Sequence, residues 1–193
     1  MLEALLVSTG VIALAEIGDK TQLLALLLAV RFRKPVPIVL GILAATLLNH
    51  SIAGAIGVWL AKQIDPQWMR WCLGVSFIAM AAWTLVPDKY EEKPRAPPRF
   101  GVFLTTLIAF FLVEIGDKTQ IATAALAAKY QTLLPVVAGT TLGMMLADVP
   151  AVWLGKVAAH KLPLKWVRGV AAAIFLLLGI IALFGVQFRM GVS

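Results

Sequence analysis

The chain has 193 residues, of which 61% are hydrophobic, and its mean hydropathy is +0.90. Soluble domains of this size contain about half apolar residues, so the composition excludes a water-soluble globule and indicates a protein embedded in lipid. The net charge of +7 comes from basic residues in short segments between apolar stretches, a pattern that sets membrane topology and does not indicate nucleic-acid binding.

Six apolar stretches follow one another along the chain, and each reaches or approaches the roughly 20 residues that a helix needs to cross a bilayer. Backbone polar groups cannot stay open in lipid, so helices are the expected structure of such stretches. We predict an all-α polytopic membrane protein with six transmembrane helices, at residues 4–30, 36–61, 69–87, 101–128, 133–158 and 167–187.

The heptapeptide EIGDKTQ occurs twice, at residues 16–22 and 114–120, which is an offset of 98 residues. The same offset aligns further residues without a gap and indicates an internal duplication. Three spans in each copy make an odd number, so we predict two inverted three-helix repeats, an architecture typical of alternating-access transporters. The aligned pairs are Pro37 with Pro135, Gly41 with Gly139, Gly57 with Gly155, Trp68 with Trp166, Arg70 with Arg168 and Phe77 with Phe175.

One hydrophilic segment, residues 88–99, separates the two copies. Its prolines and its charges of both signs are typical of a flexible connection. We therefore expect a first three-helix repeat at 1–87, a cytoplasmic linker at 88–99 and a second three-helix repeat at 100–193.

Basic residues concentrate on one predicted face of the membrane. They follow the first and third stretches and surround the link between the fifth and sixth, whereas the other face receives only four. The positive-inside rule then places both termini outside the cytoplasm. The first group is Arg31, Arg33, Lys34, Lys89, Lys93, Arg95, Arg99, Lys156, Lys161, Lys165 and Arg168, and the second is Lys62, Arg70, Lys129 and Arg189.

The acidic residues of the two heptapeptides are the primary candidates for a metal site: Glu16, Asp19, Glu114 and Asp117. Glu16 stands at the midpoint of its apolar stretch, where one charged side chain costs about 2.5–3.5 kcal/mol, so we expect these groups to face the interior. In a continuous helix, residues three apart share a face and converge on one cation. Gly18 and Gly116 predict that the helix unwinds there and frees carbonyl oxygens as further ligands.

Other oxygen donors complete the candidate site: Thr21, Thr119, Gln22, Gln120, Asn49 and Asp148. Such a donor set favours hard cations such as Mn²⁺, Ca²⁺ and Mg²⁺. The single cysteine, Cys72, excludes a thiolate cluster and argues against Cu(I). The glycines of the second and fifth stretches, Gly41, Gly54, Gly57, Gly139, Gly143 and Gly155, predict close helix packing.

The roles of three further groups, His50, Lys20 and Lys118, stay open at this point. His50, aligned with Asp148, is either a ligand or proton carrier or the hydrogen-bond partner of a neighbour. Lys20 either pairs with Glu16 one turn earlier or extends away from the site. If Lys20 and Lys118 instead neutralise Glu16 and Asp19 in permanent ion pairs, the motif only joins helices.

The doubled E-x-G-D-K-T motif resembles the signature of a family of cation/proton antiporters that includes the Golgi manganese and calcium transporters of eukaryotes and bacterial manganese exporters. EIGDKTQ stands intact in both copies, each copy belongs to a unit of three spans, and the resemblance covers essentially the whole chain. It implies that Mn²⁺ or Ca²⁺ is exported in exchange for protons, and that the acidic residues of both motifs bind the cation. The six-span length looks like the bacterial branch, which implies the inner (plasma) membrane.

We therefore predict a divalent cation transporter without a cofactor or enzymatic activity, with Mn²⁺ ahead of Ca²⁺ as substrate and protons as counter-ion. A passive cation channel, a non-transporting assembly subunit and an exporter of a small organic cation are the alternatives. An intramembrane enzyme needs a nucleophile or an activated water, and no Ser/His or HExxH arrangement supplies one. The expected partners are the metal and the lipid bilayer, and the sequence leaves the oligomeric state open.

Overall fold

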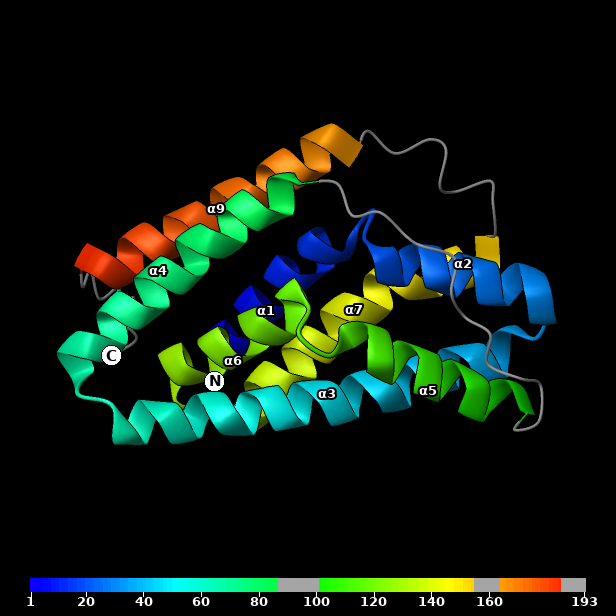
Figure 1. Ribbon diagram of the computed structural model, residues 1–193, viewed down its shortest axis with the longest axis horizontal. Coiled ribbons are helices and arrows are strands. Elements are labelled where there is room, and N and C mark those ends of the chain that lie inside the picture. Colours follow the sequence, from blue (N-terminus) through cyan, green and yellow to red (C-terminus); the bar gives the residue numbers. More distant parts are fainter. Residues whose placement is uncertain (87–100, 155–163, 185–193) are drawn as a thin grey trace.

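The computed structural model describes residues 1–86, 101–154 and 164–184, and every regular element in these ranges is a helix (Figure 1). The all-α prediction is therefore confirmed for the described residues. The predicted linker at 88–99, the predicted span ends at 87, 155–158 and 185–187, and with them Gly155, lie outside the described residues. The helices are α1 (Leu2–Glu16), α2 (Lys20–Phe32), α3 (Pro35–Gln63), α4 (Pro66–Leu85), α5 (Gly101–Glu114), α6 (Lys118–Tyr130), α7 (Leu134–Leu154) and α9 (Leu164–Phe184).

Four helices in the described ranges are long and apolar enough to cross a membrane: Pro35–Gln63, Pro66–Leu85, Leu134–Trp153 and Lys165–Phe184. They correspond to the second, third, fifth and sixth predicted spans. The first and fourth predicted spans are not among these four, because each consists of two helices of 13 to 15 residues.

Both interruptions fall inside the heptapeptide. Gly18 has a φ of 79° and Gly116 a φ of 76°, in the left-handed region that glycine enters without the steric cost of a Cβ. The predicted unwinding at these two glycines is thus confirmed. The second half-helices also end alike, because Arg33 and Gln131, which the 98-residue offset aligns, have φ values of 52° and 50°. The same local backbone therefore occurs twice.

Proline and a capping side chain set the starts of the long helices. Pro35 and Pro66 occupy the first turns of α3 and α4, where a missing N–H costs nothing and the fixed φ suits a helix. At α4 the Asp65 Oδ1 atom also accepts a hydrogen bond from the Gln67 backbone N–H at 2.8 Å. The short turn between α3 and α4 follows from these residues.

Each half packs against the other through contacts that the repeat offset relates. At Gly41 of α3 an added Cβ would lie 2.8 Å from the Phe103 carbonyl oxygen on α5, and at Gly139 of α7 it would lie 2.5 Å from the Leu5 carbonyl oxygen on α1. Leu5 and Phe103 are themselves aligned by the offset, so one contact maps onto the other. The close packing predicted at the glycines of α3 and α7 is confirmed for these two and for Gly54, Gly57 and Gly143.

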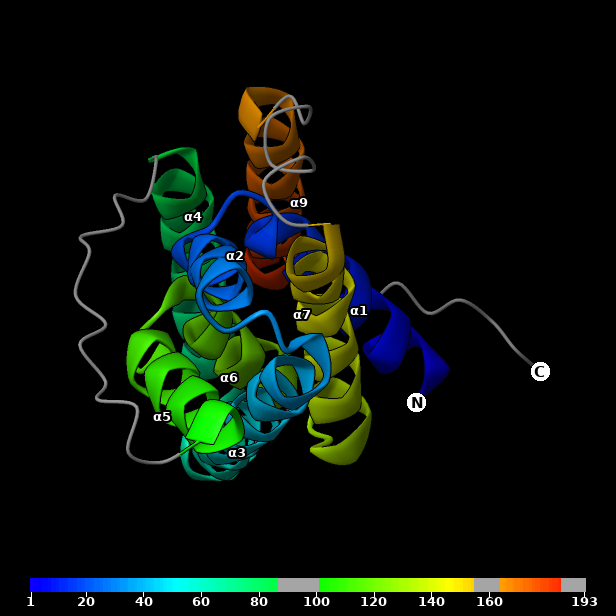
Figure 2. The ribbon, with the colours of Figure 1, turned by 90° about the vertical axis from the view of Figure 1, so that its right-hand side faces the viewer.

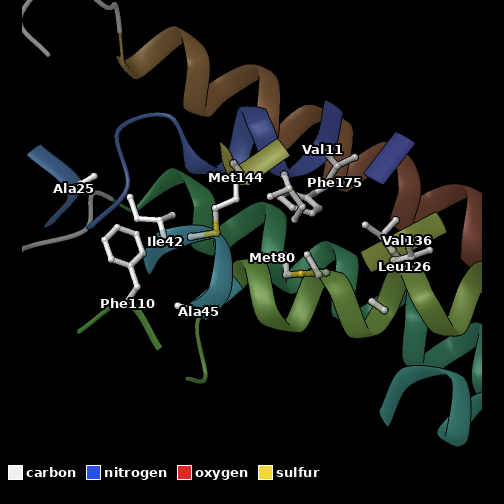
Figure 3. Packing of buried hydrophobic residues seen from close by; sticks show 14 of the residues in the cluster. Val11, Ala25, Ile42, Ala45, Met80, Phe110, Leu126, Val136, Met144 and Phe175 are labelled. Atoms are coloured by element: carbon white, nitrogen blue, oxygen red, sulfur yellow. The ribbon is translucent and has the colours of Figure 1, made fainter. Parts of the chain in front are cut away.

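Some residues meet their own counterparts. The rings of Phe77 on α4 and Phe175 on α9 stack with their centroids 6.5 Å apart. The Thr46 hydroxyl on α3 donates a hydrogen bond to the Met144 sulfur on α7 at 3.4 Å. Each pair joins aligned positions, as residues on a two-fold axis do. Figure 3 shows Met144, Ile42 and Phe175 in the apolar core, to which both halves contribute.

The contacts also give the relative directions of the helices. Gly139 lies beside Leu5 and Gly143 beside Thr9, so α1 and α7 run parallel. On the outer pair, Phe77 stacks on Phe175, while Arg70 near the start of α4 reaches Leu183 near the end of α9, so these helices run antiparallel. Figures 1 and 2 show α4 and α9 side by side, next to the bundle of the other helices. We call them the α4/α9 pair.

Replacing Gly57 by Ala is expected to lower the thermal stability of the protein. The added Cβ would lie 2.1 Å from the Ala124 carbonyl oxygen, a backbone atom that can only move with α6. Overpacking of this kind costs about 1–3 kcal/mol. Thermal unfolding in detergent measures the effect, with Gly10→Ala as the control because nothing lies within 4 Å of that Cβ. An equal loss in both variants would contradict close packing as the cause.

Candidate cation site at the two helix breaks

The four acidic residues of the heptapeptides flank the two breaks. Glu16 and Glu114 are the last residues of α1 and α5, and Asp19 and Asp117 are the residues that precede α2 and α6. All four are buried, with at most 1% of their surface exposed. The expectation that each Glu and Asp share one helix face is wrong, because the unwound turn separates them. Each Asp instead stands at a helix N-terminus, where the helix dipole favours negative charge.

Lysines of one half bind aspartates of the other. The Lys20 Nζ atom lies 2.7 Å from Asp117 Oδ1, and Lys118 Nζ makes the equivalent ion pair with Asp19 Oδ1. Lys20 therefore neither pairs with Glu16 nor extends away, whereas the pair of Lys118 with Asp19 agrees with the alternative in which lysines of the motif neutralise its acids. Lys118 is buried, whereas the Lys20 side chain keeps 26% of its surface exposed. The two crossed ion pairs therefore join the breaks and balance the charges of two acids.

Three other buried carboxyl groups have open oxygens. Within the described ranges, both carboxyl oxygens of Glu16, both of Asp148 and the Glu114 Oε1 atom have no hydrogen-bond partner. Asp148 on α7 interacts electrostatically with Glu16 and Glu114. A carboxylate buried in low dielectric without a partner is costly, so these groups require a proton or a cation. When all five acids of the cluster are ionised, the two lysines balance two of the negative charges, and three negative charges remain.

The threonines and glutamines of the motif support this arrangement in different ways. The Thr119 hydroxyl donates to Glu114 Oε2 at 3.1 Å and to Asp117 Oδ2 at 3.2 Å, and Thr21 donates to Asp19 Oδ2 at 3.4 Å. The Gln22 and Gln120 side-chain oxygens accept the Gly18 and Gly116 backbone N–H groups at 2.9 and 2.7 Å. The glutamines thus hold the unwound turns in place, while the threonine hydroxyls remain next to the carboxylates.

His50 reaches the site from α3, and Asn49 on the same helix contacts α5 one turn before the second break. Asn49 Nδ2 donates to the Phe111 carbonyl oxygen at 3.1 Å, and its Oδ1 atom has no partner among the described residues. His50 Nε2 lies 3.9 Å from Glu114 Oε2, which is beyond hydrogen-bond distance. Neither ring nitrogen of His50 has a hydrogen-bond partner among the described residues, so its interpretation as a neighbour's hydrogen-bond partner is not supported there.

Arg168 is a neighbour that sequence reasoning missed. Its Nη2 atom donates a hydrogen bond to the Gly18 carbonyl oxygen at 3.1 Å, and so brings α9 to the first break. We expected only a topology role for this residue. The signal in the sequence was its alignment with Arg70, the one other arginine that the repeat offset matches.

The site as it stands is an ion-paired acidic cluster and not a finished metal centre. Over residues 1–86, 101–154 and 164–184, no three His, Cys, Asp or Glu side chains are arranged to hold a metal ion. Two of the candidate ligands hold lysines instead. A cation entering the cluster would meet hard oxygen donors from both halves, and it would have to replace the two ammonium groups.

Comparisons with known proteins match the chain to a family and to several relatives. The family described as "Divalent cation/proton antiporter GDT1" matches residues 4–92 and 102–188. A Vibrio cholerae protein named "Putative manganese exporter" is 50% identical over 95% of this chain and 92% of its own length. A GDT1-like protein of Synechocystis is 29% identical over 94% and 97%, and GDT1-like protein 3 of Arabidopsis thaliana is 26% identical over 90% and 68%. No solved structure matches the chain.

Proposed function

Because the chain belongs to the GDT1 family of divalent cation/proton antiporters, we propose that it exports Mn²⁺ in exchange for protons by alternating access. The family is one of transporters and not of enzymes. The observation that carries the proposal is the meeting of the two helix breaks, where buried acids from both halves form one cluster. The name of the Vibrio cholerae relative favours Mn²⁺ over Ca²⁺ as the principal substrate.

The transported cation binds between the two breaks. Glu16, Asp19, Glu114 and Asp117 are the proposed principal ligands. Oxygen atoms of Asp148, Asn49, Thr21 and Thr119 are the proposed supplementary ones, because they lie in or next to the same acidic cluster. Gln22 and Gln120 are weaker candidates than the sequence suggested, since their oxygens already accept backbone N–H groups. This oxygen-rich set suits Mn²⁺ and also Ca²⁺.

The crossed lysines suggest how the cation enters. Mn²⁺ supplies the same two positive charges as the ammonium groups of Lys20 and Lys118, so it replaces them without adding net charge next to Asp19 and Asp117. Protons bind the partnerless carboxyls when the metal leaves. Moving two charges against the membrane potential costs about 2.3 kcal/mol per charge per 100 mV, and a return of two protons cancels that cost.

The helix lengths support six crossings. At 1.5 Å per residue, α1 and α2 are each only about 20 Å long, less than the hydrocarbon core of about 30 Å. We therefore propose that α1 with α2, and α5 with α6, each cross once as a broken helix. Parallel α1 and α7 and antiparallel α4 and α9 are the directions that two inverted three-span repeats require.

The proposed setting is the inner (plasma) membrane, with both termini outside the cytoplasm, as the basic segments indicate. Reporter fusions within residues 88–99 and at the C-terminus are expected to lie on opposite sides of the membrane. Finding both on one side would contradict the inverted repeats.

Flux measurements test the proposed exchange. In proteoliposomes that contain the purified chain, we expect Mn²⁺ flux that an imposed pH gradient accelerates at least about tenfold, since a tenfold proton gradient is worth about 1.4 kcal/mol per proton. Ca²⁺ in place of Mn²⁺ establishes the preference between the two metals. Flux that ignores the pH gradient would indicate a passive channel, and no flux of either metal would favour an assembly subunit.

A further inference from the structure

The α4/α9 pair packs on only one end of the broken helices. In the described residues, α9 packs against α1 and α4 packs against α6, whereas α2 and α5 are not among its substantial neighbours. The start of α1 and the end of α6 meet, because the Tyr130 hydroxyl donates to Glu3 at 3.4 Å. The pair therefore lies on the end that α1 and α6 share, as its position in Figure 1 shows.

This packing departs from the exchange symmetry of the rest of the bundle. Under the repeat offset, the contact of α9 with α1 corresponds to a contact of α4 with α5. In the same way, the contact of α4 with α6 corresponds to a contact of α9 with α2. Neither of these two arrangements is formed to a comparable extent in the described residues. The α4/α9 pair thus occupies one of two packing positions that the repeat makes equivalent. The other position lies at the end shared by α2 and α5.

Two aligned arginines take part in the asymmetry. Arg168 Nη2 donates to the Gly18 carbonyl oxygen at 3.1 Å, at the break of the first half. Arg70 Nη2 donates at 2.9 Å to the Leu183 carbonyl oxygen, near the end of α9 and within the pair itself. The last carbonyls of a helix have no intrahelical donor, so Leu183 offers a suitable acceptor. One arginine therefore holds a break, while the other holds a helix end.

Acceptors for the reverse arrangement are already present in the chain. The offset maps Gly18 onto Gly116, which is surface-exposed, and nothing lies within 4 Å of a Cβ built on it. It also maps Leu183 onto Leu85, the last residue of α4, whose carbonyl again lacks an intrahelical donor. If the pair moved to the other packing position, Arg70 could donate to the Gly116 carbonyl oxygen at the second break. Arg168 could then donate to the Leu85 carbonyl oxygen at the end of α4.

We propose that the α4/α9 pair is the moving element of the transport cycle, and that Arg70 and Arg168 hold its two positions by exchanging their carbonyl partners. The inference rests on the proposed function, which requires two states of the protein. Each move replaces one arginine–carbonyl bond at a break by the equivalent bond at the other break. Guanidinium groups keep their charge throughout, so both arginines remain hydrogen-bond donors in either position.

Distances between spin labels test this movement in the full chain in lipid nanodiscs, without metal. The matched label pairs are Leu23 with Lys165, which reports α2 to α9, and Ile121 with Gln67, which reports α6 to α4; all four residues are exposed and the offset relates the two pairs. The background carries Cys72→Ser, which removes the single cysteine. Double electron–electron resonance gives the populations of short and long distances for each pair.

In the wild type we expect the Leu23–Lys165 pair to give the shorter distance, because Arg168, one turn after Lys165, is bonded to Gly18 just before α2, whereas Arg70 is bonded away from the second break. A minor population should show the two label pairs with their distances exchanged. Arg168→Gln removes the bond to the first break and should shift the ratio of populations about fivefold towards the minor state, as expected for one net hydrogen bond. Arg70→Gln should shift it about fivefold the other way. Arg168→Lys should restore most of the wild-type ratio, since an ammonium still donates to a carbonyl.

Shifts in the same direction for both glutamine variants, or no shift in either, would overturn the inference. Mn²⁺ flux in proteoliposomes separates it from the proposed function. If the distances exchange as expected but no Mn²⁺ is transported, the moving element stands and the assignment of its cargo fails. If Mn²⁺ flux is normal and each label pair gives a single unchanging distance, the moving element is wrong and the proposed export stands.

Discussion

Replacing Glu16 by Gln is expected to reduce proton-coupled Mn²⁺ flux by at least about 100-fold, because partners that merely orient a metal ligand already cost about 10–100-fold. The Glu16 carboxyl is buried, and neither of its oxygens has a partner in the described residues. The amide keeps the size of the side chain and removes both the negative charge and the proton-binding group. Flux into proteoliposomes under a fixed pH gradient measures the loss.

Glu114→Gln should behave in the same way, since Glu114 occupies the aligned position at the second break. Glu3→Gln is the matched control: the same chemical change on the same helix as Glu16, at an exposed residue outside the acidic cluster. Its flux should stay within about twofold of the wild type, as expected for a surface substitution. Wild-type flux in both Glu16→Gln and Glu114→Gln would assign the motif to helix packing.

Replacing Lys118 by Met is expected to make the protein depend on the metal for its stability. Breaking a buried ion pair from one side costs about 3–5 kcal/mol, because the remaining Asp19 charge is left in a low-dielectric interior. Bound Mn²⁺ would offset that cost, so added Mn²⁺ should raise the midpoint of thermal unfolding more in the variant than in the wild type. Transport should slow, since the metal no longer has a competitor that displaces it.

Lys20→Met provides a graded comparison. Its ion pair with Asp117 is equivalent, but the Lys20 side chain is partly exposed, so both the destabilisation and the dependence on Mn²⁺ should be smaller. Thermal unfolding with and without Mn²⁺, together with flux, measures both effects. If neither variant gains stability from Mn²⁺ beyond the wild type, the lysines do not compete with the metal.

Much of this arrangement could be predicted from the sequence because it is local. Apolar stretches of membrane-spanning length predict helices, and glycine inside a charged motif predicts an unwound turn, which Gly18 and Gly116 confirm. The offset of 98 residues likewise predicted which positions correspond. These inferences use properties of neighbouring residues or of the chain compared with itself.

The partners of the charged side chains could not be predicted in the same way. A pairing of Lys20 with Glu16 assumes one continuous helix, and the unwound turn removes that register. The actual partner, Asp117, comes close only when the halves are packed together. The hydrogen bond from Arg168 to Gly18 also depends on where the α4/α9 pair packs. Because the sequence is repeated, it does not distinguish between the two equivalent packing positions.

Contacts between aligned residues, such as Phe77 with Phe175, show that the two halves of this chain pack around a shared axis as two subunits of a dimer would. Two separate copies of a single half, associated around the same axis, would have to present identical groups at corresponding places. They would supply two imidazoles or two carboxylates where this protein has His50 and Asp148. In one polypeptide the two halves can differ in sequence, so the cluster has a fifth acid, Asp148, from one half and an imidazole, His50, from the other.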